Sequence, residues 1–381
     1  MITGKKIKLF VDAHCFDGEF QGAQTFVRGL YTALLQQDET DIYFGTANPE
    51  NLRMAIPGIA PGNILVYKKR RPAILRFIFD IPAILKSNDF DYAHFQYLAP
   101  TGVKHCRYIV TMHDVLFNDF RCSFGWRYRL TRDFLFGRSF RNAAIKTTVS
   151  AYSRERISRC FRTPFEQIHI VQNGVNSGFS KNLSTGNARG LIREKYGIRN
   201  FILYVSRIEP RKNHLLLLNM FLELELYKQG ISLVFIGKKS LQVPAFQENI
   251  TSLTTEQRQF FHWIEQVSQD DLHAFYGACR LFVYPSKAEG FGIPPLEAAV
   301  CKVPVLCSNT TAMEAYTFFK PFTFDPAHTD DFRNKLKAMI ETEQTSCELE
   351  KTAATVLEKY SWENSAAGFY MLLYQNYQQW N

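Results

Sequence analysis

The chain has 381 residues, a length too great for one ordinary hydrophobic core and suited to two domains of about 150–200 residues. Apolar residues make up 46% of the chain and charged residues 21%, a balance that excludes an intrinsically disordered protein. The formal net charge is +9. Residues 1–183 hold 25 basic and 15 acidic residues, a net charge of +10, so the remaining residues carry −1. This basic excess predicts an anionic partner for the N-terminal half.

The eight cysteines lie far apart and form no CxxC pair. This spacing favours free thiols in a reducing compartment over a zinc site or a disulfide scaffold. The N-terminal residues are basic and are followed by a predicted buried strand, without the apolar region of a secretory signal. No stretch reaches the ~18 consecutive apolar residues that a membrane span needs. We therefore expect a cytoplasmic protein, soluble or peripheral on the inner face of the membrane.

Short β-branched runs alternate along the chain with stretches of helical periodicity, a pattern typical of parallel sheets with crossover helices. In the first half, residues 7–13 are expected to form a buried strand and residues 23–37 a helix. Further strands are predicted at 64–67, 91–96, 107–113, 146–151 and 168–173. A run of Asn, Ser, Thr and Gly at 173–189 is then typical of a linker.

The alternation restarts after this run, with a helix predicted over 213–228. Strands are predicted at 201–207, 232–237, 281–286, 304–308 and 322–325. The restart indicates an α/β protein of two doubly wound domains, joined near 183–195. Ligands of such sheets bind beyond the carboxyl ends of the strands. We therefore expect the functional site in the cleft between the domains.

The segment KAEGFGIPPLEAAV (287–300) follows a predicted strand and contains a helix that opens on two prolines. Proline suits a first helical turn, where its missing N–H would be unpaired in any case. The backbone N–H groups of Phe291, Gly292 and Ile293 are expected to point out of this helix start, with the positive end of the helix dipole behind them. Such a helix start binds phosphate readily.

Seven residues separate Glu289, on the predicted loop, from Glu297, on the first helical turns. Carboxylates beside an anion site do not bind the phosphate itself. They suit hydroxyl groups, which predicts a sugar and a ribose as the neighbouring groups. The alternative is an ordinary strand–turn–helix with an incidental glycine and two solvated glutamates.

A second strand-to-helix segment is YVSRIEPRKNHLLLL (204–218). Arg207 ends the predicted strand and Lys212 lies near the helix start, so both can reach a diphosphate over the sheet edge. The alternative is that Arg207 pairs with Glu209, while Arg211 and Lys212 are solvated.

Together, these two segments resemble the group 1 glycosyltransferases of the GT-B fold, in the retaining family 4. The family signature is a pair of glutamates in an EGFG-like context, preceded by Arg–x4–Lys in the first strand–helix unit. Supporting pieces occur in the family's order along nearly the full length: FDYAHFQYLAP (90–100), TMHDV (111–115), TVSAYSRERI (148–157), IVQNGVN (170–176), CKVPVLCS (301–308) and KYSWENSA (359–366).

The resemblance implies a role for each matching residue of the second half. Arg207 and Lys212 would bind the diphosphate of the donor. Glu289 would hold hydroxyls of the donor sugar, beside the three backbone amides at the helix start, and Glu297 would bind the ribose.

In the first half, the resemblance implies that His113 reaches the donor sugar beside the anomeric carbon. The alternative is a core histidine at a strand end. Gly22 matches a glycine-rich loop whose backbone approaches the donor phosphates, which the absence of a Cβ allows. The chain has Ala23 and Lys302 where the family commonly has glycine.

The resemblance further implies retaining, metal-independent transfer of a hexosyl group from a nucleoside-diphosphate sugar to a glycan or lipid-linked acceptor. We favour mannose as the sugar and GDP-mannose as the donor, in the synthesis of a surface polysaccharide such as lipopolysaccharide. No DxD follows a predicted strand, so we expect no metal ion, and no cofactor beyond the sugar nucleotide as co-substrate. Fixed cations are expected to stabilise the leaving diphosphate.

Two other functions remain open on the sequence. The pI of 9.0 and the interleaved basic and aromatic residues also suit a nucleic-acid-binding protein, although no helix-turn-helix, RNP or zinc pattern occurs and we expect no nucleic acid partner. A GT-B-like sugar-nucleotide epimerase or phosphorylase would share the cleft, but not the paired glutamates with Arg–x4–Lys.

The predicted domains are an acceptor-side Rossmann-like domain at 1–183, a sugar-nucleotide-binding Rossmann-like domain at 184–360, and a C-terminal helix at 361–381 that crosses back to the first domain. Basic and apolar residues are interleaved at 68–86 and more strongly at 124–146. This pattern predicts peripheral contact with an anionic membrane. The alternative is that the aromatic residues are core and the arginines form a solvated face.

Overall fold

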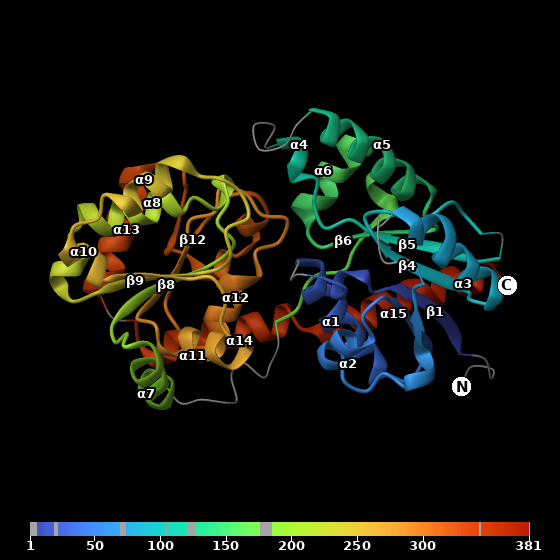
Figure 1. Cartoon of the computed structure of the whole chain (residues 1–381), viewed down its shortest axis with the longest axis horizontal. Coiled ribbons are helices and arrows are strands. Elements are labelled where there is room, and N and C mark those ends of the chain that lie inside the picture. The colour runs from blue at the N-terminus through green and yellow to red at the C-terminus, as the bar shows by residue number, and fades with distance from the viewer. Residues whose placement is uncertain are drawn as a thin grey trace. The chain divides into compact units, whose positions relative to one another are not determined.

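The structure is a computed structural model that describes residues 6–18, 22–68, 74–103, 105–119, 126–175, 185–342 and 344–380. The chain divides into two compact units (Figure 1). Unit 1 comprises Met1–Gly174 and Tyr360–Asn381, and unit 2 comprises Val175–Lys359. The predicted boundary at 183 lies among residues 176–184, outside the described residues.

Unit 1 is built around a parallel sheet, in which the described residues form seven strands in the order β3-β2-β1-β4-β5-β6-β7. The central strand β1 is almost fully buried, which its run of Leu, Phe and Val accounts for. The strands are β1 (Ile7–Asp12), β2 (Thr40–Thr46), β3 (Ile64–Val66), β4 (Tyr92–Gln96), β5 (Arg107–Thr111), β6 (Ile145–Thr148) and β7 (Ile168–Ile170).

Helices cover both faces of this sheet, as expected for a doubly wound fold (Figure 1). Their amphipathic patterns bury one face each; in α1, for example, Phe26, Leu30 and Leu34 point into the core. The helices are α1 (Gly22–Leu35), α2 (Pro49–Ala55), a π-helical turn (Arg76–Asp80) that continues into α3 (Ile81–Ser87), α4 (Leu116–Asp119), α5 (Trp126–Asn142), α6 (Ala151–Phe161) and α15 (Trp362–Trp380).

Unit 2 repeats this architecture, with six parallel strands among its described residues in the order β10-β9-β8-β11-β12-β13. The strands are β8 (Phe201–Val205), β9 (Ser232–Ile236), β10 (Phe261–Ile264), β11 (Leu281–Tyr284), β12 (Val305–Ser308) and β13 (Thr323–Phe324). The helices are α7 (Thr185–Tyr196), α8 (His214–Glu223), α9 (Pro244–Thr251), α10 (Thr255–Gln259), α11 (Gln269–Ala278), α12 (Ile293–Val300), α13 (Thr329–Glu341) and α14 (Ser346–Lys359).

Each sheet has one topological switch point, the place where two crossover connections run to opposite sides of the same strand. In unit 1 the chain leaves β1 toward β2 on one side and later places β4 on the other side. In unit 2 the same divergence occurs at β8, which lies between β9 and β11. Loops on either side of a switch point leave a crevice at the carboxyl ends of the strands, where such folds bind ligands.

The predicted α/β class with two parallel sheets is confirmed, but part of the predicted linker is wrong. Residues 185–196 form α7, because Ala188 and Ile192, one helical turn apart, are buried against α11. Two strands, β2 and β10, were absent from the sequence prediction. Both lie at or near a sheet edge, and all four residues of β10 are half-buried, so β10 carries a weak apolar signal.

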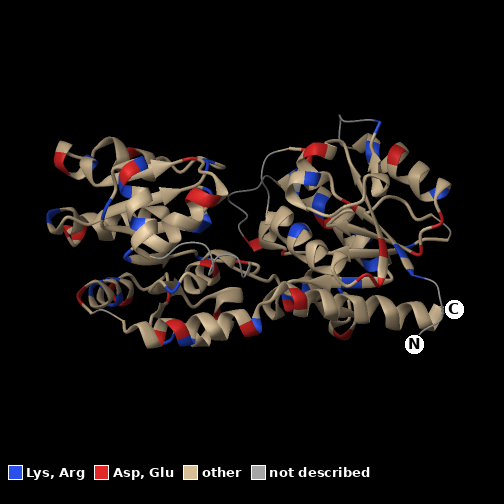
Figure 2. Ribbon diagram, turned by 90° about the horizontal axis from the view of Figure 1, so that it is seen from below, with Lys and Arg blue, Asp and Glu red and all other residues tan. Residues whose placement is uncertain are grey.

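The C-terminal helix α15 packs along α1 in unit 1. Ser361 caps its start, since its Oγ accepts a hydrogen bond from the backbone N–H of Asn364 at 3.0 Å. Near its end, Asn376 Oδ1 accepts hydrogen bonds from Tyr92 and Arg107 at 2.9 and 2.8 Å. Glu363 is the one charged residue within α15, so nearly all of this helix is tan in Figure 2. Within the described part of the chain, no helix has both the length and the apolar character needed to cross a membrane.

Trp362, the first residue of α15, is buried against two glycines. A Cβ on Gly29 of α1 would lie 2.0 Å from the indole Cε2, and a Cβ on Gly174 would lie 2.4 Å from the backbone nitrogen of Trp362. Neither position tolerates a side chain unless the tryptophan moves. The indole therefore fixes the approach of α15 to α1.

We predict that Gly29→Ala destabilises unit 1 by about 1–3 kcal/mol through overpacking, and that Trp362→Ala costs about 3–5 kcal/mol through the cavity it leaves. In the double variant the added methyl group falls into that cavity, so the two losses should be clearly less than additive. Urea unfolding measures each value. Gly368→Ala on α15, where a Cβ meets nothing within 4 Å, is the control and should not destabilise. Fully additive losses would show that the indole does not fill the space over Gly29.

Candidate functional site

The chain between β8 and α8 follows the carboxyl edge of the unit 2 sheet closely. Gly237, at the end of β9, has a φ of +149°, and a Cβ there would lie 2.1 Å from the carbonyl oxygen of Ser206. The glycine thus lets the two neighbouring chain segments pass side by side. A 3-10 turn (Pro210–Lys212) then leads through Asn213, which has a φ of +58°, into α8. This path places Lys212 at the switch point of unit 2.

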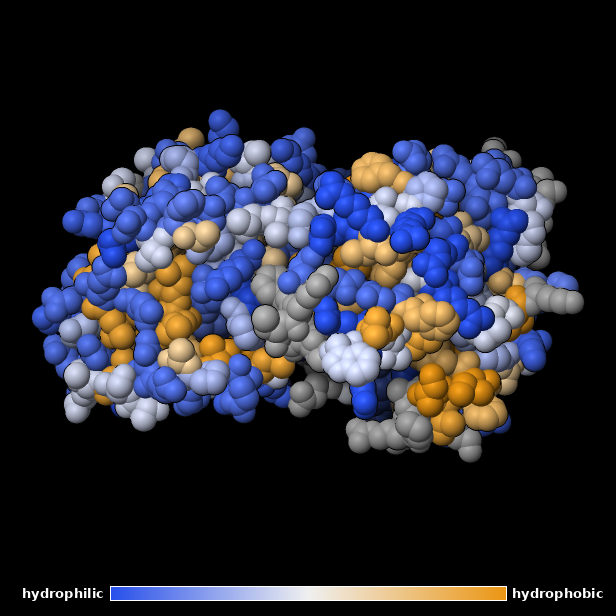
Figure 3. Space-filling model, turned by 90° about the horizontal axis from the view of Figure 1, so that it is seen from above, coloured by the Kyte–Doolittle hydropathy of each residue, from blue (hydrophilic) through white to orange (hydrophobic). Residues whose placement is uncertain are grey.

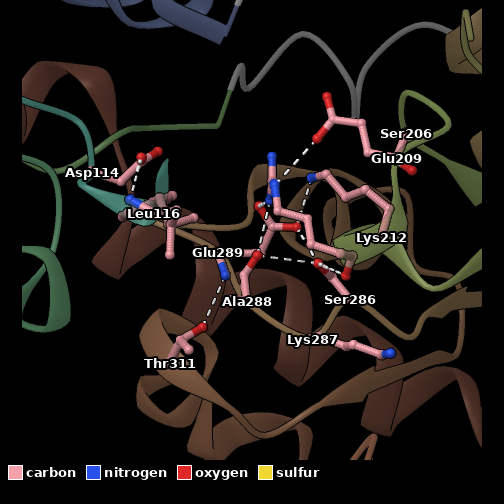
Figure 4. Close-up of polar contacts among 12 residues, drawn as sticks. Asp114, Leu116, Ser206, Glu209, Lys212, Ser286, Lys287, Ala288, Glu289 and Thr311 are labelled. Atoms are coloured by element: carbon pink, nitrogen blue, oxygen red, sulfur yellow. Dashed lines mark hydrogen bonds and ion pairs between the residues drawn. The ribbon is translucent and has the colours of Figure 1, made fainter. Parts of the chain in front are cut away.

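The carboxylate of Glu289 is the centre of a buried polar cluster, which we call the Glu289 cluster (Figure 4). Its Oε1 accepts hydrogen bonds from Lys212 Nζ at 2.6 Å, Ser286 Oγ at 2.5 Å and Tyr284 Oη at 3.0 Å. Its backbone N–H donates to Thr311 Oγ1 at 2.9 Å, which anchors the loop. The cluster thus joins residues that follow β8 to residues that follow β11.

Arg211 is a member of the cluster that the sequence did not identify, since it was weighed only as a solvated residue. Its Nη1 donates to Glu289 Oε2 at 3.2 Å and to the carbonyl oxygen of Ala288 at 2.9 Å, while its Nε lies 3.2 Å from Glu209. The backbone N–H of Lys287 donates to the Arg211 carbonyl at 2.8 Å. Arg211 therefore fixes the shape of the loop that carries Glu289.

The electrostatics of the cluster favour an anionic ligand. Burial alone would raise the pKa of Glu289, but the charges of Lys212 and Arg211 outweigh it and bring this pKa to about 2. Burial lowers the pKa of Lys212, against the opposing effect of Glu289. Glu289 and Glu209 together balance the charges of Lys212 and Arg211, and Lys212 is poorly hydrated because it is buried. Arg207, which lies 3.9 Å from Glu209, leaves these five side chains with one positive charge in excess, which suits a further anion.

Glu297 lies on α12, near the same sheet edge, and its Oε2 accepts a hydrogen bond from Tyr276 of α11 at 2.8 Å. The structure confirms a helix over Ile293–Val300 with prolines in its first turn. Gly292 caps the helix with a φ of +91°, and Tyr316 donates to the carbonyl oxygen of Phe291 at 2.6 Å. The loop that precedes the predicted phosphate-binding amides is therefore held in one shape.

Arg207 does not join the Glu289 cluster. Its side chain is 47% exposed, and its Nε lies 3.9 Å from Glu209 Oε1, at the limit of an ion pair. The structure thus brings Lys212 together with Glu289, but places Arg207 toward solvent. Lys302, where glycine is common in the family, has a φ of +57° at the end of α12, a conformation that costs about 1–2 kcal/mol for a residue with a Cβ.

In unit 1, His113 follows β5 and is held by Gln96 at the end of β4. The His113 Nε2 donates to Gln96 Oε1 at 2.8 Å, and Phe26 packs edge-on against the ring. Burial lowers the pKa of His113 to about 4, so the ring is neutral near pH 7. A neutral ring with its proton on Nε2 presents Nδ1 as an acceptor. The sequence did not identify Gln96 as a site residue. The available signal was the presence of polar residues at positions 94 and 96 of a buried strand.

Gly22 is the first residue of α1, and residues 19–21 before it are outside the described residues. Among the residues that the structure describes, no atom lies within 4 Å of a Cβ placed on Gly22. Among the residues that the structure describes, no group of three His, Cys, Asp or Glu side chains is placed to hold a metal ion.

Two family models match the chain: "Glycosyl transferases group 1" over residues 189–356 and "Glycosyltransferase Family 4" over residues 20–179. Escherichia coli O-antigen chain mannosyltransferase B is 27% identical over 227 residues, 59% of each protein. The serotype-specific mannosyltransferase WbdA of the same species is 34% identical over 181 residues, 46% of this chain and 22% of WbdA. The matches thus span about three fifths of the first relative and about a fifth of the second.

Solved structures show the same fold. HepE from Anabaena, in complex with UDP-glucose, superposes with a TM-score of 0.76 at 14% identity, over 97% of this chain and all of that chain. WaaG, a glycosyltransferase involved in lipopolysaccharide biosynthesis, gives a TM-score of 0.68 at 18% identity, over 95% of this chain and 99% of that chain. The two parallel-sheet units therefore form a GT-B fold, as the sequence predicted.

We predict that the free energy of unfolding falls as the pH is lowered from 7 toward 4.5. Burial lowers the pKa of His94 to about 3, of His113 to about 4 and of His214 to about 3, from the ordinary 6.5. Between these limits the unfolded chain binds more protons than the folded one, so acid favours unfolding. The depressed pKa values of Asp12 and Glu289 act only below 3.8 and 4.5, outside this window.

Urea unfolding over a pH series measures the slope. In His113→Gln the slope should fall by nearly one proton, about 1.4 kcal/mol per pH unit. An unchanged slope in this variant would mean that His113 is charged in the folded protein.

Proposed function

The chain belongs to the group 1 glycosyltransferases, and we propose that it transfers a hexosyl group from a nucleoside-diphosphate sugar to a glycan or lipid-linked acceptor. We propose mannose as the sugar and GDP-mannose as the donor, in the synthesis of a surface polysaccharide. The O-antigen mannosyltransferases among the relatives support this choice. The observation that carries the proposal is the buried Glu289 cluster at the switch point of unit 2.

In this proposal the diphosphate of the donor binds at the cations of unit 2. Lys212 is desolvated and Arg211 is held in place, so neither must be ordered when the anion arrives. Arg207 is exposed and can turn toward the ligand from its ion pair with Glu209. The start of α12, with the amides of residues 291–293 and a helix dipole behind them, adds a further source of positive potential.

The two glutamates bind hydroxyl groups in this proposal. Oε1 of Glu289 already accepts three hydrogen bonds from the protein, whereas Oε2 accepts from Arg211. We therefore assign the donor-sugar hydroxyl to Oε2. Glu297, held by Tyr276, is the proposed ligand of the ribose.

We propose that the reaction retains the anomeric configuration and proceeds without a metal ion. The bond from the anomeric carbon to the leaving phosphate oxygen breaks, and its electron pair passes to the diphosphate. The acceptor hydroxyl oxygen forms a bond to the same carbon from the same face, and its proton passes to the leaving phosphate oxygen. Lys212 and the start of α12 stabilise the charge of the leaving diphosphate because they are fixed before the reaction, and Arg207 adds its charge once it has turned toward the ligand. Neutral His113 is proposed to hold the donor sugar beside the anomeric carbon, with its ring oriented by Gln96.

The test of the proposed function is the release of GDP from GDP-mannose in the presence of EDTA, with octyl α-mannoside as the acceptor. We expect the parent protein to form a dimannoside of retained configuration. In Glu289→Gln, turnover should fall by about 100-fold or more, because a charged contact to the transition state is lost. GDP should still bind, since the cations remain. Glu314→Gln changes an exposed glutamate on the following 3-10 turn (Thr311–Ala315) and should leave turnover unchanged.

Three outcomes would contradict parts of this proposal. Loss of activity in EDTA with recovery on adding Mg²⁺ would overturn metal independence. Normal turnover in Glu289→Gln would remove Glu289 from the site. Formation of an epimeric sugar nucleotide, without transfer to the acceptor, would instead support an epimerase.

We further propose that unit 1 contacts an anionic membrane through α5 and the π-helical turn Arg76–Asp80. Trp126, Leu130 and Phe134, spaced by four residues on α5, are each at least 60% exposed. Ile78 and Phe79 of the π-helical turn are also exposed.

Hydrophobic and strongly hydrophilic side chains adjoin one another on the part of the surface that unit 1 forms (Figure 3). The alternative, that the aromatic residues of this region belong to the core, holds for Phe136 and Phe140, which are buried. Exposed aromatics beside arginines support membrane contact.

We predict that the parent protein co-sediments with phosphatidylcholine vesicles only when they also contain phosphatidylglycerol. The variant Leu130→Ser/Phe134→Ser should bind the vesicles at least about tenfold more weakly, because it lacks two apolar side chains that the membrane would remove from water. Met54→Ser, which changes an exposed methionine on α2, is the control and should bind normally. Equal binding by the double variant, or to vesicles without phosphatidylglycerol, would contradict the surface or its electrostatic basis.

A further inference from the structure

The switch point of unit 1 holds a second buried carboxylate, outside the Glu289 cluster. Asp12 ends β1 and is fully buried. Tyr67 Oη donates to its Oδ1 at 2.6 Å, His14 Nδ1 contacts its Oδ2 at 3.0 Å, and Arg76 Nε lies 3.9 Å from the same oxygen. Burial alone would raise the pKa of Asp12, but His14, Arg76 and Tyr67 bring it to about 2. The carboxylate is thus ionised and inaccessible to a ligand.

The residues around Asp12 are rigidly placed. A Cβ on Gly45 of β2 would lie 2.4 Å from Tyr67 Oη, so the glycine lets the phenol reach Asp12. The backbone N–H of Ala13 donates to the carbonyl of Gly45 at 2.9 Å. Just after His14, Asp17 Oδ1 accepts hydrogen bonds from Thr46 Oγ1 and from the backbone N–H groups of residues 47 and 48. These bonds fix the short turn His14–Phe16 to the end of β2.

His14 is the member of this group that reaches solvent, with a side chain 22% exposed. When the imidazole is neutral and its Nδ1 donates to the ionised Asp12, the lone pair of the ring lies on Nε2. Within the described part of the chain, Nε2 of His14 makes no hydrogen bond. A desolvated, immobile carboxylate thus orients one imidazole nitrogen, and that nitrogen has no partner among the described residues.

We propose that His14 binds the acceptor: its Nε2 accepts a hydrogen bond from a hydroxyl group of a carbohydrate at the switch point of unit 1, and Asp12 is the positioning residue. A hydroxyl matches this geometry because it donates one hydrogen bond and carries no charge to be desolvated. The Arg76 Nε is buried and has no hydrogen-bond partner among the described residues, and the charge of this side chain helps to keep Asp12 ionised. The assignment rests on the proposed function and adds the acceptor side to it.

A purely structural role predicts different behaviour. In that case the His14–Asp12 contact would serve to satisfy a buried carboxylate, because an uncompensated one is costly. Any variant that keeps a donor at the Nδ1 position would then be functional. The two roles use different nitrogens of the ring and can be separated by substitution.

The experiment compares His14→Ala, His14→Asn and His14→Gln, with GDP-mannose as donor and octyl α-mannoside as acceptor. The Asn amide keeps a donor near Nδ1 but offers nothing at Nε2, whereas the Gln amide can place an acceptor near Nε2. For transfer, we expect kcat/KM with respect to the acceptor to fall about 100-fold in the Ala and Asn variants and to recover in part in the Gln variant. Hydrolysis of GDP-mannose by water and GDP affinity should be unchanged. The melting temperature should fall in the Ala variant, which leaves the buried Asp12 carboxylate without its imidazole partner, and should fall less in the Asn variant, which keeps a donor there.

Each outcome is decisive. If Asn restores transfer and Gln does not, or if donor hydrolysis falls together with transfer, His14 is structural and the inference is overturned. Normal transfer in all three variants also overturns it, and leaves the proposed function intact. If the parent protein neither binds GDP nor releases it from GDP-mannose, the proposed function itself fails. This measurement on the parent does not depend on the His14 variants, so the two failures can be told apart.

Discussion

The order of the parallel strands is the constraint on which both polar sites of this protein depend. All strands of a parallel sheet end at the same edge, and crossovers are right-handed, so loops diverge only where the chain changes direction across the sheet. In unit 1 this occurs beside β1 and in unit 2 beside β8. Asp12 with His14 follows the first strand, and Lys212 follows the second. Topology therefore selects which residues can act together.

At both points the fold keeps an ionised carboxylate out of water, which is costly unless charges and donors surround it. Glu289 has two cations and two hydroxyl groups around it, and Asp12 has an imidazole, a phenol and a guanidinium. In neither case does the carboxylate need to move to be stable. The cost of desolvation is met during folding, so the neighbouring polar groups are oriented before any ligand binds.

The sequence predicted the sheets well because buried parallel strands are continuous apolar runs, as at residues 201–205 and 281–284. It missed β2 and β10, and it took Asn, Ser and Gly around 185–190 for a linker although Ala188 and Ile192 anchor a helix.

The contents of the Glu289 cluster and the surroundings of His113 were only partly predictable from the sequence. Lys212 and Glu289 lie in recognisable segments, but their pairing in one cluster joins residues 77 positions apart. Arg211 acts through contacts that no local pattern encodes, whereas Gln96 could be suspected only from the polar residues at 94 and 96 of a buried strand. Arg207 was expected to reach the same diphosphate as Lys212, from its place at a strand end and from the family resemblance, but its side chain is 47% exposed and lies outside the Glu289 cluster.

The packing of Trp362 has a consequence for how such enzymes can be recombined. The chain leaves unit 1 after Gly174 and returns at Tyr360, and a Cβ on Gly174 would lie 2.4 Å from the backbone nitrogen of Trp362. Unit 2 is thus an insertion whose two ends meet at one point of its host. Domains whose termini are close together tolerate transplantation, because the host loses little chain entropy when the inserted segment is replaced. The corresponding residues of another family member could therefore replace unit 2 as one block between these two points, while the recipient keeps its own unit 1 and the tryptophan at the junction.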